Sequence, residues 1–310
     1  MAHSTPNTLR KTRTPKSKIS RVSRKKDLAA WLLMLPSLAL FAFFVWEPLL
    51  ETVHMSFYKV KGVTLENFVG LKNYLTVLKH PVFAKALPNT IMYTVWSLVI
   101  GFFVPILIAA LITETVHLKG LFRVGVYFPN IIPGIAALLI LTYFFGSGDT
   151  GVLNILLNKI GLGPLPWLTN ARWTIPLIVL AMTWKSAGST ALIYMAGIAG
   201  INPEMYEAAT LDGANPLQRF FFITLPCIFN LGKTMLIMQI IAVFQILYEP
   251  LMMTNGGPNN ASISLMQLVY RFAFEEYKYA QAAALSVMIC LILIVLTAVY
   301  FKVAKTTDNE

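Results

Sequence analysis

Two short patterns in this 310-residue chain resemble nucleotide-binding motifs, and both lack the surroundings that such chemistry needs. The run GSGDTG at 146–151 matches G-x-G-x-x-G, which binds a dinucleotide only after a strand and at the start of a helix. Here it follows a long apolar run, so we expect a flexible turn. The run LGKT at 231–234 resembles the end of a phosphate loop, but its first glycine is replaced by Cys227 and it lies in an apolar stretch. We therefore expect no ATP site in this chain.

Metal and thiol chemistry is equally poorly supported by the sequence. Cys227 and Cys290 both lie in apolar runs, and neither has the spacing of a disulfide framework or a metal site. The four histidines are scattered without ligand spacing: His3, His54, His80 and His117. We predict that the chain binds no cofactor or metal and is not an enzyme.

The composition shows which elements must position any functional residues. The chain is 56% hydrophobic and 13% charged with a mean hydropathy of +0.65, whereas soluble domains have about 45–50% apolar and about 25% charged residues. These values exclude a soluble enzyme and a disordered chain. The net charge of +11 is concentrated in residues 1–27, where nine Lys/Arg face only Asp27. The basic residues therefore form a tail, and we expect no nucleic-acid partner.

Six apolar runs are long enough to cross a hydrocarbon core of about 30 Å. We predict an all-α fold, a polytopic membrane helix bundle, with six transmembrane helices. Basic tails favour the cytoplasm, which places both termini inside and makes 1–27 and 303–310 cytoplasmic tails and 58–88 an extracytoplasmic loop. The predicted spans lie at about 28–57, 89–113, 124–146, 174–199, 223–248 and 280–302.

The segment between the fourth and fifth spans has the signals of a short, capped helix. Asn202 is a good N-cap residue, Pro203 suits the first helical position, and Glu204 interacts favourably with the helix dipole. Gly213 can adopt the left-handed conformation that ends a helix, and Asn215 begins a second one. The segment holds three acidic residues and one basic residue, so an anionic membrane surface attracts it weakly. A protein partner fits it better.

This segment resembles the E-A-A-x3-G-x9-I-x-L-P loop in the membrane subunits of ABC importers. The matching residues are Glu207, Ala208, Ala209, Gly213, Ile223, Leu225 and Pro226. Further stretches look like carbohydrate-uptake permeases, in particular the first permease of maltose-type or glycerol-phosphate-type systems. They lie at 67–74, 89–90, 254–258 and 270–274.

The resemblance implies a type I ABC importer permease fold with a core like that of methionine-importer permeases over residues 89–302. Loop 202–226 would contain a coupling helix at 203–214, including Asp212, that seats on an ATPase subunit. The implied partners are a second homologous permease, two ABC ATPase subunits that bind ATP and Mg, and an extracytoplasmic solute-binding protein. The implied role is ATP-driven uptake of a sugar or oligosaccharide across the cell membrane.

By position in this family, the spans before and after the coupling loop line the substrate path. The residues so implied are Met182, Trp184, Lys185, Ser186, Ser189, Gln239 and Val243. A cation within a membrane helix costs about 2.5–3.5 kcal/mol on insertion scales and usually faces a cavity or a partner. Lys185 therefore binds either an anionic substrate, such as a uronate or a phosphate, or a carboxylate of the partner subunit, unless it reaches the outer interface.

One rival function is an ion-coupled secondary transporter or channel subunit. Such a protein needs acidic residues inside its spans for proton or sodium coupling. Glu47, Glu114 and Glu249 all lie near span ends or in loops. A membrane-embedded transferase, the second rival, needs a cluster of His, Asp and Glu near one interface, which the sequence lacks.

Overall fold

The computed structural model describes residues 24–62, 64–114 and 118–307. Most of the predicted basic tail and the last three residues of the predicted C-terminal tail lie outside these residues, so the orientation of the termini stays a prediction. The chain divides into two compact units, Met1–Leu50 and Glu51–Glu310.

The first predicted span is a nearly continuous helix. It comprises α1 (Arg24–Phe41), a π-helical turn η1 (Ala42–Trp46) and α2 (Glu47–Ser56). Its apolar part, Ala30–Ser56, has 27 residues. At 1.5 Å per residue this is about 40 Å, enough to cross a bilayer with some tilt.

A small hairpin follows, which the all-α prediction did not include. Strands β1 (Tyr58–Lys61) and β2 (Thr64–Phe68) are antiparallel, with Val60 opposite Leu65. Lys59 Nζ and Glu66 Oε2 form an ion pair of 2.8 Å across the strands. The helix α3 (Lys72–Leu78) is tied to this region by Asn73, whose Nδ2 donates to the carbonyls of Ser56 and Tyr58.

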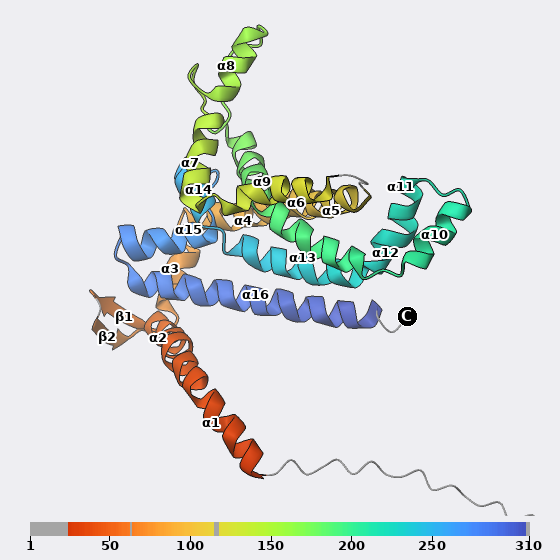
Figure 1. Ribbon diagram of the computed structural model, residues 1–310. Helices are drawn as coiled ribbons and strands as arrows, with labels where there is room; N and C mark the ends of the chain where they lie inside the picture. Colours follow the sequence, from red (N-terminus) through yellow and green to blue (C-terminus); the bar gives the residue numbers. More distant parts are fainter. Residues whose placement is uncertain (1–23, 63, 115–117, 308–310) are drawn as a thin grey trace, which may run out of the picture. The chain divides into compact units, whose positions relative to one another are not determined.

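The prediction of six spans agrees with the structure when each bent helix pair counts as one span (Figure 1). Among the described residues, four continuous stretches are long and apolar enough to cross a membrane: Ala30–Ser56, Phe83–Glu114, Ala171–Ala199 and Tyr279–Ala304. The other two are Lys119–Ile131 with Gly134–Phe144, bent by 94°, and Pro216–Cys227 with Phe229–Phe244, bent by 70°. The sequence predicted the spans but not these bends.

The remaining element bounds place the parts of the site. Between Phe83 and Glu114 lie α4 (Phe83–Trp96), η2 (Ser97–Gly101) and α5 (Phe103–Glu114). The next elements are α6 (Lys119–Ile131), α7 (Gly134–Phe144), α8 (Val152–Lys159), α9 (Ala171–Ala199) and α10 (Pro203–Leu211). The chain continues through α11 (Pro216–Arg219), η3 (Phe220–Thr224), α12 (Leu225–Cys227) and α13 (Phe229–Phe244). The last are α14 (Tyr248–Thr254), α15 (Leu265–Tyr270), η4 (Arg271–Glu275) and α16 (Tyr279–Thr307).

Helix α9 is the central element of the second unit, because α4, α5, α6, α7 and α14 all pack against it. Gly188 allows the closest approach: a Cβ built there would lie 2.1 Å from the carbonyl oxygen of Val126 in α6. The two helices therefore meet backbone to backbone. On the α4 side, Tyr93 is fully buried and donates its hydroxyl to the carbonyl of Ser262.

Asn89 and Thr90, one of the stretches that resemble carbohydrate-uptake permeases, tie α4 to the chain that follows α14. Asn89 Nδ2 donates to the carbonyls of Asn260 and Ile263, and the Thr90 hydroxyl accepts from the backbone N–H of Leu265. Asn260 Oδ1 in turn accepts from Arg271. The chain after α14 is thus fastened to the first half of the Phe83–Glu114 span.

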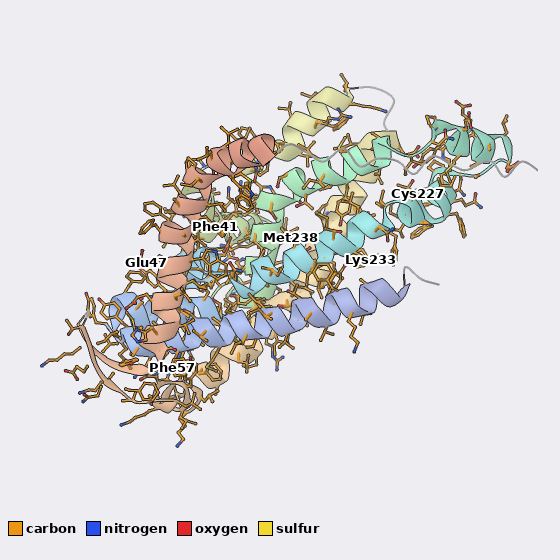
Figure 2. All side chains as sticks on the ribbon, turned by 90° about the horizontal axis from the view of Figure 1, so that it is seen from below. Phe41, Glu47, Phe57, Cys227, Lys233 and Met238 are labelled. Carbon is orange, nitrogen blue, oxygen red and sulfur yellow. The ribbon has the colours of Figure 1, made fainter. Side chains whose placement is uncertain are left out.

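The two nucleotide-like patterns have structural roles in the fold. The glycines of 146–151 form a tight turn, in which a Cβ on Gly151 would lie 2.1 Å from the Gly146 carbonyl oxygen. Asn154 holds this turn by donating to the carbonyls of Gly146 and Gly148. The LGKT run lies inside α13, where Figure 2 labels Lys233 and Met238 on the same helix.

Candidate functional site

The short helix predicted between the fourth and fifth spans is present as α10, and its start is capped as the sequence predicted. The Asn202 side chain accepts a hydrogen bond of 3.1 Å from the backbone N–H of Glu204, and Pro203 occupies the first turn. The Glu204 carboxylate lies in that turn as well, where the positive end of the helix dipole favours it.

The end of α10 depends on Gly213, which has φ = +79°. The Ala214 N–H donates to the Ala209 carbonyl at 2.8 Å and the Gly213 N–H to the Thr210 carbonyl at 3.1 Å. This is a Schellman motif, in which a left-handed residue satisfies the last free carbonyls of a helix. In the described part of the chain, a Cβ on Gly213 would meet nothing within 4 Å. The backbone conformation, and not crowding within this chain, therefore favours glycine here.

The chain then turns back toward the membrane through a second capped start. Asn215 and Gln218 form a reciprocal capping box at the first turn of α11. Ile223 lies in the π-helical turn η3, and Leu225 and Pro226 form α12, just before the 70° bend into α13. The residues that match the E-A-A loop thus lie on α10, at the turn that ends it, and on η3 and α12.

Every α10 side chain is at least partly exposed, which leaves this helix available to a partner. Glu207, Ala208, Asp212 and Gly213 are exposed, and Ala209 is half-buried. The Leu211 side chain is 89% exposed. Met205 on the same helix is 44% exposed, so α10 presents two apolar side chains together with its carboxylates.

A polar network beneath α10 was not anticipated from the sequence. Arg219 Nη2 lies 2.8 Å from Glu114 Oε2, and its Nη1 donates to the Thr210 hydroxyl at 2.9 Å. The Tyr206 and Thr224 hydroxyls are 2.9 Å apart. Arg219 is the one basic residue of this acidic segment, and this was the available signal. Its partner Glu114 lies 105 positions away, which no local pattern reveals.

Lys185 meets groups of its own chain. Its Nζ donates a 2.8 Å hydrogen bond to the carbonyl of Ile132, at the break between α6 and α7. Burial raises the pKa of the Glu249 carboxyl in the first turn of α14, while that carboxyl's own backbone hydrogen bond and the charge of Lys185 lower it. The hydrogen bond from Lys185 to Ile132 stabilises the C-terminal end of α6, where the last backbone carbonyls need a donor or a cation.

The other residues of the predicted substrate path face different surroundings within this chain. Val243 is fully buried, and Met182 packs against the same hydrophobic cluster. Gln239 Nε2 donates to the Ser97 carbonyl at 2.7 Å. The Ser186 and Ser189 hydroxyls donate to backbone carbonyls of α9 itself, and Trp184 lines an apolar pocket of about 360 Å³. Their part in a substrate path stays a prediction.

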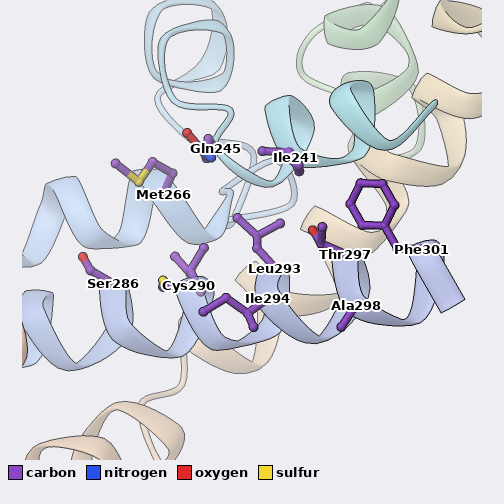
Figure 3. A pocket seen from close by; sticks show the side chains of 11 residues that line it. Ile241, Gln245, Met266, Ser286, Cys290, Leu293, Ile294, Thr297, Ala298 and Phe301 are labelled. Carbon is purple, nitrogen blue, oxygen red and sulfur yellow. The ribbon is translucent and has the colours of Figure 1, made fainter. Parts of the chain in front are cut away.

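A second hollow, of about 590 Å³, lies between α13 and α16 (Figure 3). It is mostly apolar, with Gln245, Ser286 and Thr297 as its polar side chains. All of its lining residues differ from those of the predicted substrate path. Its chemistry suits apolar groups better than a sugar, which needs several hydrogen-bond partners.

Comparison with known proteins gives consistent matches over most of the chain. Residues 101–306 match the family described as binding-protein-dependent transport system inner membrane component. The chain is 33% identical to the probable ABC transporter permease protein YurN of Bacillus subtilis (strain 168), over 92% of this chain and 99% of that protein. It is 30% identical to the arabinooligosaccharides transport system permease protein AraP of the same organism, over 92% of this chain and 91% of AraP.

Solved structures agree with these matches. The fold is similar to a chain of a bacterial ABC transporter involved in the import of the acidic polysaccharide alginate, with a TM-score of 0.81 and 27% identity over 91% of this chain and 96% of that chain. A second structure, of bacterial alginate ABC transporter in complex with alginate pentasaccharide-bound periplasmic protein, matches with a TM-score of 0.79 and 28% identity. It covers 89% of this chain and 93% of its own.

Proposed function

We propose that the cargo of this chain is a sugar or an oligosaccharide. The chain belongs to the family of binding-protein-dependent transport system inner membrane components, and it is a permease subunit of an ABC importer. Two observations support the cargo. AraP is named for arabinooligosaccharides, and the similar solved transporter imports alginate, also a carbohydrate polymer.

The proposed assembly contains a second, homologous permease, two ATPase subunits and an extracytoplasmic solute-binding protein. One similar structure holds a periplasmic protein with bound pentasaccharide, which supports the last of these partners. ATP and Mg bind to the ATPase subunits, and this chain forms half of the translocation pathway. In this arrangement both termini and α10 lie in the cytoplasm.

The observation that carries the mechanism is the capped, exposed helix α10. Its ends are fixed by Asn202 and Gly213, so it can move as a rigid piece. Its exposed Leu211 and Glu207 offer an apolar contact and a carboxylate to a groove on the ATPase. A carboxylate paired with a basic group in such a groove gains charge-assisted hydrogen bonds. Closure of the ATPases on ATP then displaces α10, and the bundle rocks between inward-facing and outward-facing states.

The test uses the complete importer in proteoliposomes with its binding protein. We expect Glu207→Lys and Gly213→Asp to abolish uptake while ATP hydrolysis continues without transport. Glu66→Gln, which removes an exposed carboxylate from the hairpin, is the matched control and should leave both activities unchanged. Normal uptake and normal coupling in both α10 variants would contradict the assignment of α10 as the coupling helix.

The cargo is tested separately, on the cognate binding protein. Its affinity for neutral and acidic oligosaccharides, measured by calorimetry, should match the sugars that the whole importer takes up. If exchanging the binding protein for one of another sugar preference leaves the transported sugar unchanged, specificity resides in the permeases instead.

A further inference from the structure

One guanidinium joins the exposed helix α10 to the end of a membrane span. Arg219 Nη1 donates to Thr210 in the last turn of α10, and Nη2 pairs with Glu114. Glu114 is the last residue of α5 and of the apolar stretch Phe83–Glu114. The chain connects α10 directly to α9 and then to α11, so this contact with α5 is a tertiary one.

The electrostatics of this contact favour a specific pairing. A carboxylate at the C-terminal end of a helix is repelled by the helix dipole, so Glu114 gains from a cationic partner. The Arg219 side chain is 19% exposed and that of Glu114 is 40% exposed, so solvent screens this pair only in part. A guanidinium also presents its donors in a fixed, planar fork, so it sets the orientation of Thr210 relative to Glu114.

The space around this pair is hollow and not filled by apolar packing. A cavity of about 230 Å³ is lined by Glu114, Arg219, Tyr206 and Thr224 among other residues. The Tyr206–Thr224 hydrogen bond connects α10 to η3 along the same cavity. Polar side chains therefore bridge this cavity between α10, η3 and α5, through hydrogen bonds that fix the direction of each contact.

We propose that Arg219 is a positioning residue that transmits the displacement of α10 to the membrane span ending at Glu114. The inference rests on the proposed function, because it requires α10 to be the helix that the ATPases move. A displacement of α10 carries Thr210 with it, the hydrogen-bonded guanidinium follows, and the charged contact draws Glu114 and α5 along. Without Arg219, α10 moves while α5 lags behind.

The experiment compares substrate transported per ATP hydrolysed in the complete reconstituted importer. The variants are Arg219→Met, Glu114→Gln and the charge swap Glu114→Arg/Arg219→Glu. We expect each single variant to lower this ratio by roughly threefold to tenfold, the size of effect that single contacts have on coupling. The swap should recover most of the loss. The matched control is Glu66→Gln, which removes another 2.8 Å ion pair and should keep the wild-type ratio.

A merely structural role for Arg219 would lower the yield of assembled complex and leave this ratio unchanged in the complexes that form. An unchanged ratio in Arg219→Met, or in the nearly isosteric Glu114→Gln if the first variant fails to assemble, overturns the inference. A swap that stays at the single-variant ratio overturns the pairwise link. If these variants stay coupled while Gly213→Asp is uncoupled, only this inference falls. If Gly213→Asp and Glu207→Lys are coupled too, the proposed function falls with it.

Discussion

The close contact between α6 and α9 makes Gly188→Ala the most sharply defined perturbation of this fold. The new Cβ would lie 2.1 Å from the Val126 carbonyl oxygen, 2.7 Å from its carbon and 2.9 Å from the Tyr127 Cα. All three atoms belong to the backbone, so no side-chain rotation relieves the clash. Carbon atoms rest at about 3.5–4.0 Å, so the two helices must separate by about 1 Å or more.

Overpacking of this kind costs about 1–3 kcal/mol. For a chain of 310 residues, that corresponds to a fall in melting temperature of about 1.5–5 °C. Gly125→Ala is the matched control, because Gly125 lies next to Val126 in α6 and a Cβ added there meets none of the described residues within 4 Å. Alanine is favoured over glycine inside a helix by up to about 1 kcal/mol, so the control should be neutral or slightly stabilising.

The assay is thermal unfolding of the purified permease subunit in lipid nanodiscs, followed by intrinsic tryptophan fluorescence or differential scanning calorimetry. We expect the melting temperature of Gly125→Ala to equal or slightly exceed that of the wild type, and that of Gly188→Ala to be lower than both. If Gly188→Ala melts with the wild type, α6 and α9 are not held in backbone contact at this point and the packing argument is refuted.

Three further predictions concern single residues. Lys185→Ala should lower the free energy of unfolding by about 1.5–3 kcal/mol, the contribution of a charged hydrogen bond, and should leave the competition between acidic and neutral sugars for uptake unchanged. A selective loss of acidic-sugar uptake would instead show that Lys185 binds the substrate. Asn154→Ala should lower the free energy of unfolding by about 1–3 kcal/mol, because it removes a fully buried side chain that donates to the carbonyls of Gly146 and Gly148, and should speed proteolysis at 146–151. Gly213→Ala should lower the melting temperature more than Gly213→Asn, because asparagine tolerates the left-handed conformation better.

The helix α10 and its two ends could be predicted because their signals are local. The N-cap at Asn202, the proline after it and the glycine that ends α10 each act within one helical turn. The same holds for the spans, whose apolar length alone fixes them. The predicted helix at 203–214 starts at Pro203 as expected but ends at Leu211, because the chain turns at Asp212 and Gly213.

The bends and the polar contacts could not be predicted, because they depend on partners far along the chain. The run 124–146 predicts one helix, yet α6 ends at Ile131 and α7 starts at Gly134. The free carbonyl at this break is satisfied by Lys185, 53 positions away. Similarly, Glu114 gives no sign in the sequence that Arg219 is its partner. A side chain that bonds to a group far along the chain produces no periodic pattern in the sequence.

Helix α10 is connected to two neighbouring helices, α9 and α5, and this supports the proposal that its displacement reaches the membrane spans. Helix α10 follows directly from α9 in the chain, while Arg219 fastens its last turn to α5. Helices α5 and α9 pack against each other, with Ala109 and Tyr194 buried in the same cluster. A displacement of α10 therefore acts on both members of a packed pair, at one end through the covalent chain and at the other through an ion pair. Cutting only the ion pair removes the second of these connections and leaves the packing of α5 against α9 intact, and that is why uncoupling and not unfolding is the expected consequence.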